Sequence, residues 1–333
     1  MNGTAIQKAR EYIQETNPDI PIPEKSYLVL FSPRSGSTLL SNCLEKIGFG
    51  RPIEAFNSHL NFRKSLNWEI DFSDPHEYFK KAFSYQTLNG VMGMKLSFIQ
   101  FKLFLENARK LLSGLTEEFD DSEIVEIFFH EVKYIFIQRR KKVKQAISLA
   151  KGIQNGIWFE EEGQDSEYKK YLLPTVYDRD QIEYCFDTSL TNDIFWQHYL
   201  RKNNLSALNI YYEDLDSNFI EQMSKVYEFL NIEDKEIIAP QLRKQSNKQS
   251  EDWESRFISQ TSWFKDPEIN QAYIKGDLET LYDLRCKMII SEREMARWRS
   301  MPINRYKKIR TFAFRVRRKL TSLKNQVGRD AVN

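Results

Sequence analysis

Short apolar runs alternate with amphipathic segments along most of the chain. The apolar runs, rich in β-branched and aromatic residues and bounded by polar turns, are typical of strands buried in a parallel sheet. These runs lie at residues 27–31, 91–96, 133–138 and 207–212. Apolar residues at helical spacing predict helices at residues 38–47, 98–113, 143–150, 193–203 and 215–230. Strands that alternate with helices predict an α/β fold, a mainly parallel central sheet covered on both faces by helices.

Local composition divides the chain into three parts. Residues 1–26 predict a short helix and a Pro-rich linker, and residues 27–300 carry the alternating pattern as the main domain. Within it, the acidic, Tyr-rich and weakly periodic segment 159–190 predicts a mobile insertion. Residues 301–333 interleave many cations with apolar residues. This basic tail fits either an amphipathic helix on an anionic membrane surface or a solvated or dimer-packing segment.

Composition and charge argue against several classes of protein. The net charge is only +2, so the global basic footprint of a nucleic-acid-binding protein is missing. Cys43, Cys185 and Cys286 are widely scattered, and the four histidines show no ligand spacing, so we expect neither a disulfide framework nor a metal. No stretch approaches the roughly 18–20 apolar residues of a membrane span, and residues 1–25 lack a signal-peptide pattern. We expect a cytoplasmic protein, with peripheral contact at the inner face of the membrane through the basic tail as an option.

The turn after the first predicted strand is the most informative segment. It reads Ser-Pro-Arg-Ser-Gly-Ser-Thr from Ser32 to Thr38 and leads directly into a helix. Such a turn points free backbone N–H groups at one spot, where the helix dipole adds positive charge that attracts phosphate or sulfate. Arg34 places a bidentate cation beside it. The Walker A spacing is absent, and many similar turns bind nothing, so the turn alone leaves both interpretations open.

A second group of cations follows another predicted strand. Arg139 and Arg140 come directly after residues 133–138, and Ser148 lies nine residues after Arg139 and eight after Arg140. Because parallel sheets bind ligands at the carboxyl ends of their strands, a guanidinium and this hydroxyl would suit a second phosphate. The alternative is a solvated basic helix start. Four consecutive cations at residues 139–142 oppose the helix dipole, however, which favours a bound anion.

A third basic segment lies further along the chain. Arg243 and Lys244 are followed by Trp253 and by Arg256-Phe257. This composition predicts a basic loop with aromatic residues that closes over a nucleotide, or else an ordinary surface loop.

Taken in order, these segments resemble the sulfotransferases that use 3′-phosphoadenosine 5′-phosphosulfate (PAPS), and more narrowly the bacterial trehalose 2-sulfotransferase type. Each segment is weak alone, but the ordered set is specific and spans about residues 27–260. The segments are 27–40, 50–56, 93–96, 138–158 and 243–257. The resemblance implies a P-loop-like three-layer sandwich that transfers a sulfuryl group from PAPS to a hydroxyl of a carbohydrate or glycolipid.

The resemblance also implies roles for individual residues. The residues that would hold the 5′-phosphosulfate are Arg34, Ser35, Gly36, Ser37 and Thr38. Those that would hold the 3′-phosphate are Arg139 and Ser148, with Arg140 as a substitute if the register shifts by one. Arg243 and Lys244 would add positive charge on the same side. Trp158 or Trp253 would line the nucleotide pocket. Glu54 matches the glutamate that the family is thought to use as general base, and Lys95 would assist at the leaving group.

The expected chemistry is an in-line displacement that depends on positioning and charge stabilisation. Two catalytic assignments have simpler alternatives: Glu54 would form a salt bridge with Arg51, and Lys95 would be a surface lysine. The sequence also departs from the family pattern, since Arg140-Lys141 stands where Pro-Asp is frequent and no correspondence is visible past about residue 265.

Two other functions stay open. One is a nucleotide-dependent kinase of related fold, which the missing Walker lysine and magnesium-binding acids disfavour. The other is a non-catalytic nucleotide- or glycan-binding protein. The expected partners are a carbohydrate or glycolipid acceptor and a second copy of the chain in a homodimer, with no nucleic acid.

Overall fold

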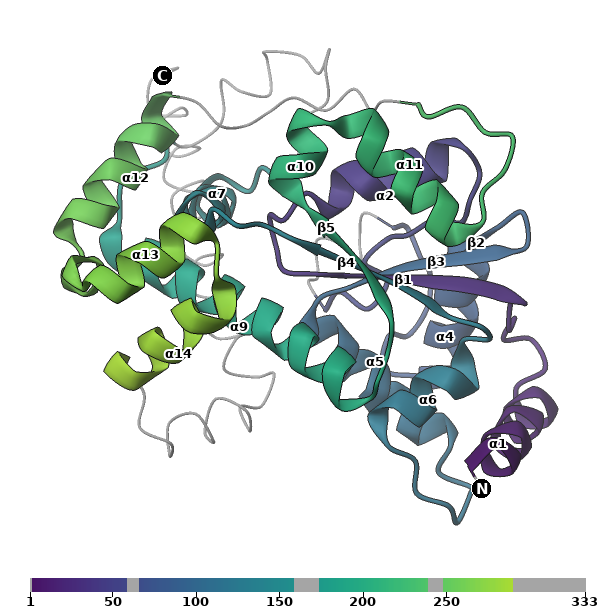
Figure 1. The fold of residues 1–333 in the computed structure, drawn as a ribbon. Helices are drawn as coiled ribbons and strands as arrows, with labels where there is room; N and C mark the ends of the chain where they lie inside the picture. Colours follow the sequence, from purple (N-terminus) through teal and green to yellow (C-terminus); the bar gives the residue numbers. More distant parts are fainter. Residues whose placement is uncertain (1, 59–65, 159–173, 239–247, 290–333) are drawn as a thin grey trace, which may run out of the picture.

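The computed structural model describes residues 2–58, 66–158, 174–238 and 248–289. Within these residues the centre is a five-stranded sheet in the order β2-β3-β1-β4-β5 (Figure 1). The strands are β1 (Lys25–Phe31), β2 (Thr87–Leu88), β3 (Val91–Leu96), β4 (Lys133–Gln138) and β5 (Ala207–Tyr211). All neighbours pair in parallel except β2, which pairs antiparallel with β3 at one edge. The carboxyl ends of β1, β3, β4 and β5 therefore lie along one side of the sheet.

The two faces of the sheet are buried under different helices. Leu28 and Leu30 of β1 belong to one core cluster, whereas Val29 and Phe31 belong to another, as expected for side chains that alternate across a strand. Figure 1 shows helices on both faces of the sheet. On one face lie α2 (Ser37–Lys46), α10 (Tyr212–Ser217) and α11 (Phe219–Leu230). On the other lie α4 (Pro75–Gln86), α5 (Phe98–Leu111) and α6 (Asp121–Phe128), with α1 (Asn2–Thr16) packed beside α6. The predicted three-layer α/β fold with a mainly parallel sheet is confirmed.

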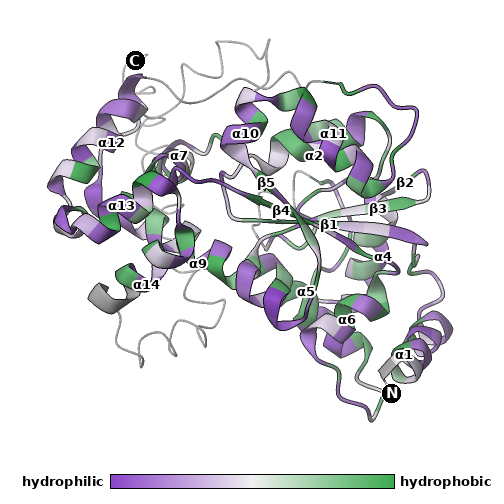
Figure 2. Cartoon of the chain, in the orientation of Figure 1, coloured by the Kyte–Doolittle hydropathy of each residue, from purple (hydrophilic) through white to green (hydrophobic). Residues whose placement is uncertain are grey.

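A third apolar cluster is built from helices at one end of the sheet. They are α7 (Lys142–Asn155), the first half of α9 (Arg179–Lys202), α12 (Lys248–Gln260), η1 (Ser262–Lys265), α13 (Pro267–Lys275) and α14 (Leu278–Ile289). Figure 2 shows mainly hydrophobic residues along the centres of the strands and a mixture of hydrophilic and hydrophobic residues along these helices. Because α7 follows β4 directly, this helical unit adjoins the carboxyl ends of the strands.

Two predicted loops are helical. Residues 179–190, the last part of the predicted insertion, form the first half of α9 and bury Ile182 and Phe186 in the third cluster. Residues 248–257 lie in α12, where Trp253 and Phe257 face the same cluster. Buried polar residues such as Ser189 interrupt the apolar period of α9, which explains why the sequence pattern is weak there.

The structure differs from the predicted helices in two other ways. The helix predicted at 215–230 is two helices, α10 and α11, with Asn218 between them in a non-helical conformation. Helices α6, α13 and α14 have no counterpart among the predictions. Residues 159–173 and 301–333 lie outside the described residues, so the division into 1–26, 27–300 and 301–333 stays a prediction.

Candidate active site at the carboxyl ends of the strands

The turn between β1 and α2 depends on a left-handed glycine. Gly36 is the N-cap of α2 with a φ of 91°, and Arg34 is also left-handed with a φ of 69°. A Cβ atom on Gly36 would lie 2.6 Å from Cδ2 of Tyr212, so only glycine fits beneath that ring. Glycine also leaves the start of α2 without a side-chain cap, and its first N–H groups can then bind an anion.

Arg34 joins the turn to the residues predicted to hold a second phosphate. Its Nε donates to Ser148 Oγ at 2.9 Å, and its Nη1 donates to the carbonyl of Trp158. Burial, together with the charge of Arg139, lowers the pKa of Arg34 to about 10. Arg34 remains protonated at neutral pH, but the repulsion between the two guanidinium groups favours an anion between them.

Arg139 and the turn share one aromatic ring. The Arg139 guanidinium lies 4.6 Å from the centroid of the Tyr212 ring, and this is the ring that covers Gly36. Arg139 Nε lies 3.8 Å from Glu213 Oε1, too far for a hydrogen bond, and is buried without a hydrogen-bond partner among the described residues. Ser35 Oγ is also buried without such a partner. These two polar atoms are compatible with an anionic ligand on this side of the turn.

Tyr212 was not identified from the sequence. It follows β5 directly, and its position at the carboxyl end of a parallel strand was the available signal.

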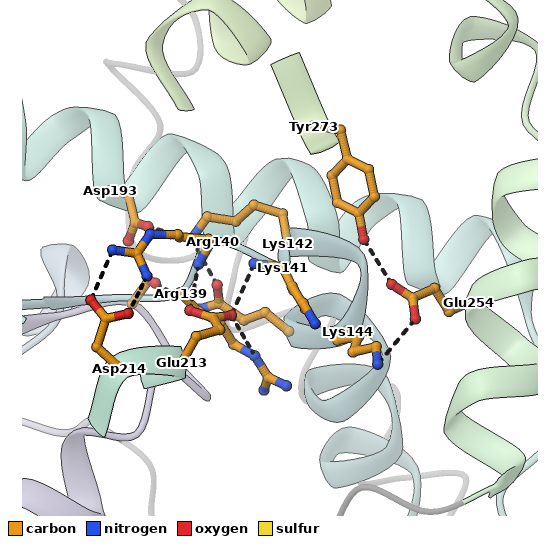
Figure 3. A network of polar contacts seen from close by, with 12 residues as sticks. Arg139, Arg140, Lys141, Lys142, Lys144, Asp193, Glu213, Asp214, Glu254 and Tyr273 are labelled. Atoms are coloured by element: carbon orange, nitrogen blue, oxygen red, sulfur yellow. Dashed lines mark hydrogen bonds and ion pairs between the residues drawn. The ribbon is translucent and has the colours of Figure 1, made fainter. Parts of the chain in front are cut away.

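Two of the remaining cations after β4, Arg140 and Lys142, form ion pairs with carboxylates of the chain itself (Figure 3). Arg140 binds both carboxylate oxygens of Asp214, at 2.6 and 2.8 Å. The backbone N–H groups of Arg140 and Lys141 each donate to Glu213 at 3.0 Å. A carboxylate of the chain, Glu213, therefore occupies the start of α7, so the run of cations does not by itself require a bound anion. Since Asp214 holds Arg140, the geometry disfavours Arg140 as a substitute for Arg139.

The last cation of the run lies beneath the turn. The side chains of Lys142 and Asp193 are both fully buried and form an ion pair. Lys142 Nζ also donates to Gln145 Oε1 at 2.7 Å, and Gln145 Nε2 donates to Ser32 Oγ at 2.8 Å and to the Pro33 carbonyl at 2.9 Å. This network connects α7 and α9 to the backbone that precedes Arg34.

Glu54 and Lys95, the two residues predicted to act in catalysis beside Arg34, lie next to each other and to the turn. Ile53 forms a parallel bridge with Met94, which places Glu54 beside β3. Lys95 Nζ lies 3.3 Å from Glu54 Oε1 and 3.3 Å from Thr38 Oγ1. Lys95 is only 6% exposed, so the interpretation as a surface lysine was wrong.

Arg51 does not pair with Glu54 in the structure. It forms a salt bridge with Glu45 at 2.8 Å instead. The alternative interpretation of Glu54 as the salt-bridge partner of Arg51 was therefore wrong.

Several predicted residues lie elsewhere or outside the described residues. Arg243 and Lys244 belong to 239–247, which the structure does not describe. Trp253 is 5% exposed in the third apolar cluster, where its position does not favour a role in the nucleotide pocket. Trp158 is 40% exposed and contacts the site through its backbone. A surface hollow lined in part by Lys25 and Lys133 lies at the amino ends of the strands, opposite the site.

The described residues lack two features, a metal-binding cluster and a membrane-spanning helix. Within them, His, Cys, Asp and Glu side chains form no group of three or more that could hold a metal ion. None of the helices seen there is long and apolar enough to cross a membrane.

The fold and the site together define an α/β protein with a glycine turn at a helix start and an adjacent pair of a buried lysine and a carboxylate. The chain belongs to the Stf0 sulphotransferase family, whose model matches residues 26–260. It is 26% identical over 262 residues to a trehalose 2-sulfotransferase of Mycolicibacterium smegmatis, covering 70% of this chain and 94% of that protein. It is 24% identical over 259 residues to a trehalose 2-sulfotransferase of Mycobacterium tuberculosis, with the same coverage. The family resemblance predicted from the motifs is confirmed.

The chain also shows a weak likeness to a sulfotransferase of known structure. The crystal structure of sulfotransferase STF9 from Mycobacterium avium matches 76% of this chain and 73% of its own, with 13% identity and a TM-score of 0.30. At this score the assignment of the fold rests on the sheet topology described above.

Proposed function

We propose that the protein transfers a sulfuryl group from PAPS to a hydroxyl group of a carbohydrate or glycolipid. The observation that carries this proposal is the position of Lys95 between Glu54 Oε1 and Thr38 Oγ1, 3.3 Å from each. A carboxylate able to accept a proton thus lies one side chain away from an anion-binding turn. Membership of the sulphotransferase family supports the reaction, and the names of the two curated relatives support a sugar acceptor.

The donor would bind along the carboxyl ends of β1 and β4. The turn from Arg34 to Thr38 would hold the 5′-phosphosulfate through backbone N–H groups and the Arg34 guanidinium. Arg139 and Ser148 would hold the 3′-phosphate, and the hydrogen bond from Arg34 to Ser148 supports two adjacent phosphate sites. Arg243 and Lys244 would add positive charge, but they lie outside the described residues. When bound, PAPS supplies the sulfuryl group and a phosphate leaving group.

The reaction would proceed by in-line displacement at sulfur. Glu54 Oε1 would accept the proton of the acceptor hydroxyl as the new O–S bond forms. The S–O bond to the 5′-phosphate breaks at the same time, and its electron pair remains on the phosphate oxygen. Lys95, Arg34 and the N–H groups of the turn would stabilise the negative charge that develops there.

Two alternative functions make different predictions. A kinase of related fold would transfer phosphate from ATP, and a non-catalytic binding protein would bind the nucleotide without transfer. We would incubate the protein with PAPS carrying a labelled sulfuryl group and a panel of sugars and glycolipids, trehalose included, with labelled ATP in parallel. We expect a labelled product with PAPS as the donor and none with ATP. The lack of any thermal shift with adenosine 3′,5′-bisphosphate would contradict nucleotide binding, because a ligand that binds only the native state must stabilise it.

The expected partners beyond the acceptor stay predictions. A homodimer and a peripheral membrane contact would both involve the basic tail at 301–333, which lies outside the described residues.

A further inference from the structure

Gln100 connects the Glu54 carboxylate to the start of a helix. Gln100 is the third residue of α5, and its Oε1 accepts the backbone N–H of Ser97, the N-cap, at 3.0 Å. Its Nε2 donates to Glu54 Oε2 at 2.6 Å. An amide oxygen cannot donate, so the bond from Ser97 fixes which end of the amide faces Glu54. The capping geometry of α5 thereby aims an N–H group at the carboxylate.

The two oxygens of Glu54 have different surroundings. Oε2 accepts two amide donors, from Gln100 at 2.6 Å and from Asn57 at 2.9 Å. Oε1 lies on the side of Lys95 and therefore of the donor turn. Gln100 is 6% exposed, so its hydrogen bond is protected from water.

The backbone around Glu54 is fixed as well. Phe56 packs its fully buried ring against Phe79 and Phe104, and the Tyr78 hydroxyl donates to the Ala55 carbonyl at 2.7 Å. With the backbone fixed, the direction of the carboxylate depends on its own hydrogen bonds.

We propose that Gln100 is a positioning residue that holds Glu54 Oε2 and so presents Oε1 to the acceptor hydroxyl. This inference rests on the proposed role of Glu54 as general base. Gln100 donates to Oε2 from a buried amide, so Oε1 is the oxygen that is left to accept the proton of the acceptor. It also fixes the orientation of the base, and small misplacements of a catalytic group can cost about 100-fold in rate.

The decisive variant is Gln100→Glu. Glutamate keeps an acceptor for the Ser97 N–H, since both Gln and Glu serve in capping boxes, but replaces the amide donor with a second carboxylate beside Glu54. Two carboxylates this close cannot both ionise freely, so the acidic limb of the kcat profile should move up by about one pH unit or more. Activity should recover as the pH rises, and the affinity for adenosine 3′,5′-bisphosphate should stay within about 2-fold of wild type because the donor turn is untouched.

Two further variants separate positioning from folding. Gln100→Leu removes both bonds, and kcat should fall by roughly 10- to 100-fold at every pH with little change in the KM for PAPS. Ser97→Ala weakens the same helix start but leaves the bond between Gln100 and Glu54, so it should lower Tm without moving the pH profile. A Gln100→Glu profile that superposes on the wild-type profile, or equal losses of activity in Gln100→Leu and Ser97→Ala, would overturn the inference.

The wild-type protein and Glu54→Gln complete the set. No sulfuryl transfer by wild type, or full transfer by Glu54→Gln, would overturn the proposed function and this inference together. Loss of transfer in Glu54→Gln with an unshifted Gln100→Glu profile would overturn only the role of Gln100.

Discussion

Removing Asp193 should destabilise the protein strongly and in a way that depends on pH. Asp193 and Lys142 are both fully buried, and the other hydrogen-bond partner of Lys142 Nζ among the described residues is the neutral amide of Gln145 at 2.7 Å. Asp193→Ala would leave an unpaired ammonium in the core. Breaking a buried pair in this way costs about 3–5 kcal/mol.

Because a lysine can lose its proton, the destabilisation caused by Asp193→Ala has an upper limit. The variant can relieve the buried charge by folding with neutral Lys142, since burial already lowers the pKa of this group. Neutralising a lysine costs about 1.4 kcal/mol for each pH unit below its ordinary pKa near 10.4, or about 5 kcal/mol at pH 7. In that case the unfolded state binds one more proton than the folded state, so the stability of Asp193→Ala should rise with pH, by up to about 3 kcal/mol between pH 7 and 9.

Urea unfolding followed by circular dichroism at pH 7 and pH 9 measures both effects. The double variant Lys142→Met/Asp193→Leu should regain most of the lost stability, because it removes both charges and keeps similar volume. The exposed pair of Lys225 and Glu221, 2.7 Å apart on α11, is the matched control, and Glu221→Ala should cost less than about 0.5 kcal/mol. A loss below about 1 kcal/mol for Asp193→Ala at pH 7 would contradict a buried, charged pair of Lys142 and Asp193.

Three other outcomes are expected. Lys95→Met should lower kcat by about 100- to 1,000-fold with a smaller effect on the KM for PAPS, because it removes a buried cation near the developing charge. Steady-state kinetics in which kcat and the KM for PAPS change by the same factor would contradict this role. Arg139→Gln and Ser148→Ala should weaken binding of adenosine 3′,5′-bisphosphate in calorimetry, Arg139→Gln by about 10- to 100-fold, and equal losses with adenosine 5′-phosphate would exclude contact with the 3′-phosphate. Asp214→Asn should cost less than about 1 kcal/mol at pH 7, since the pair with Arg140 is partly exposed. Arg140 lowers the pKa of Asp214, so the pair stabilises the fold above the carboxyl pKa of the unfolded chain. That stabilisation is lost as the pH falls through the pKa of Asp214 in the folded protein. A stability difference between Asp214→Asn and wild type that persists in denaturation at pH 2 would contradict the ion pair.

The features predicted from the sequence are those encoded locally. The turn from Arg34 to Thr38 lies within one strand–turn–helix unit, and its strand, cation and glycine are adjacent in the chain. The structure keeps that order, with Gly36 left-handed at the N-cap of α2. Alternation of strands and helices likewise predicted the sheet, because crossovers between parallel strands leave few other topologies.

The features that escaped prediction depend on contacts between distant segments. Glu54 meets Lys95 because the bridge from Ile53 to Met94 joins segments some 40 residues apart, and no local pattern encodes it. The run of cations after β4 was visible, but Glu213 and Asp214, which neutralise part of it, follow β5 more than 70 residues later.

The capping pattern of α5 is local, but the direction of its amide toward Glu54 is not. Ser97 and Gln100 have the spacing of a capping box, which a reading of helix starts can find. The other end of the Gln100 amide contacts the Glu54 carboxylate, 46 residues away, and only the folded chain brings the two together.

Sulfuryl transfer by wild type and by Glu54→Gln, measured with labelled PAPS and a sugar acceptor, decides whether Glu54 acts as the general base. Glu45→Gln, a change to a carboxylate that binds Arg51 outside the site, is the matched control. We expect Glu54→Gln to lose at least about 100-fold in kcat while it retains the thermal shift with adenosine 3′,5′-bisphosphate, and Glu45→Gln to transfer like wild type. Transfer by Glu54→Gln at the wild-type rate would contradict the role of Glu54 as general base.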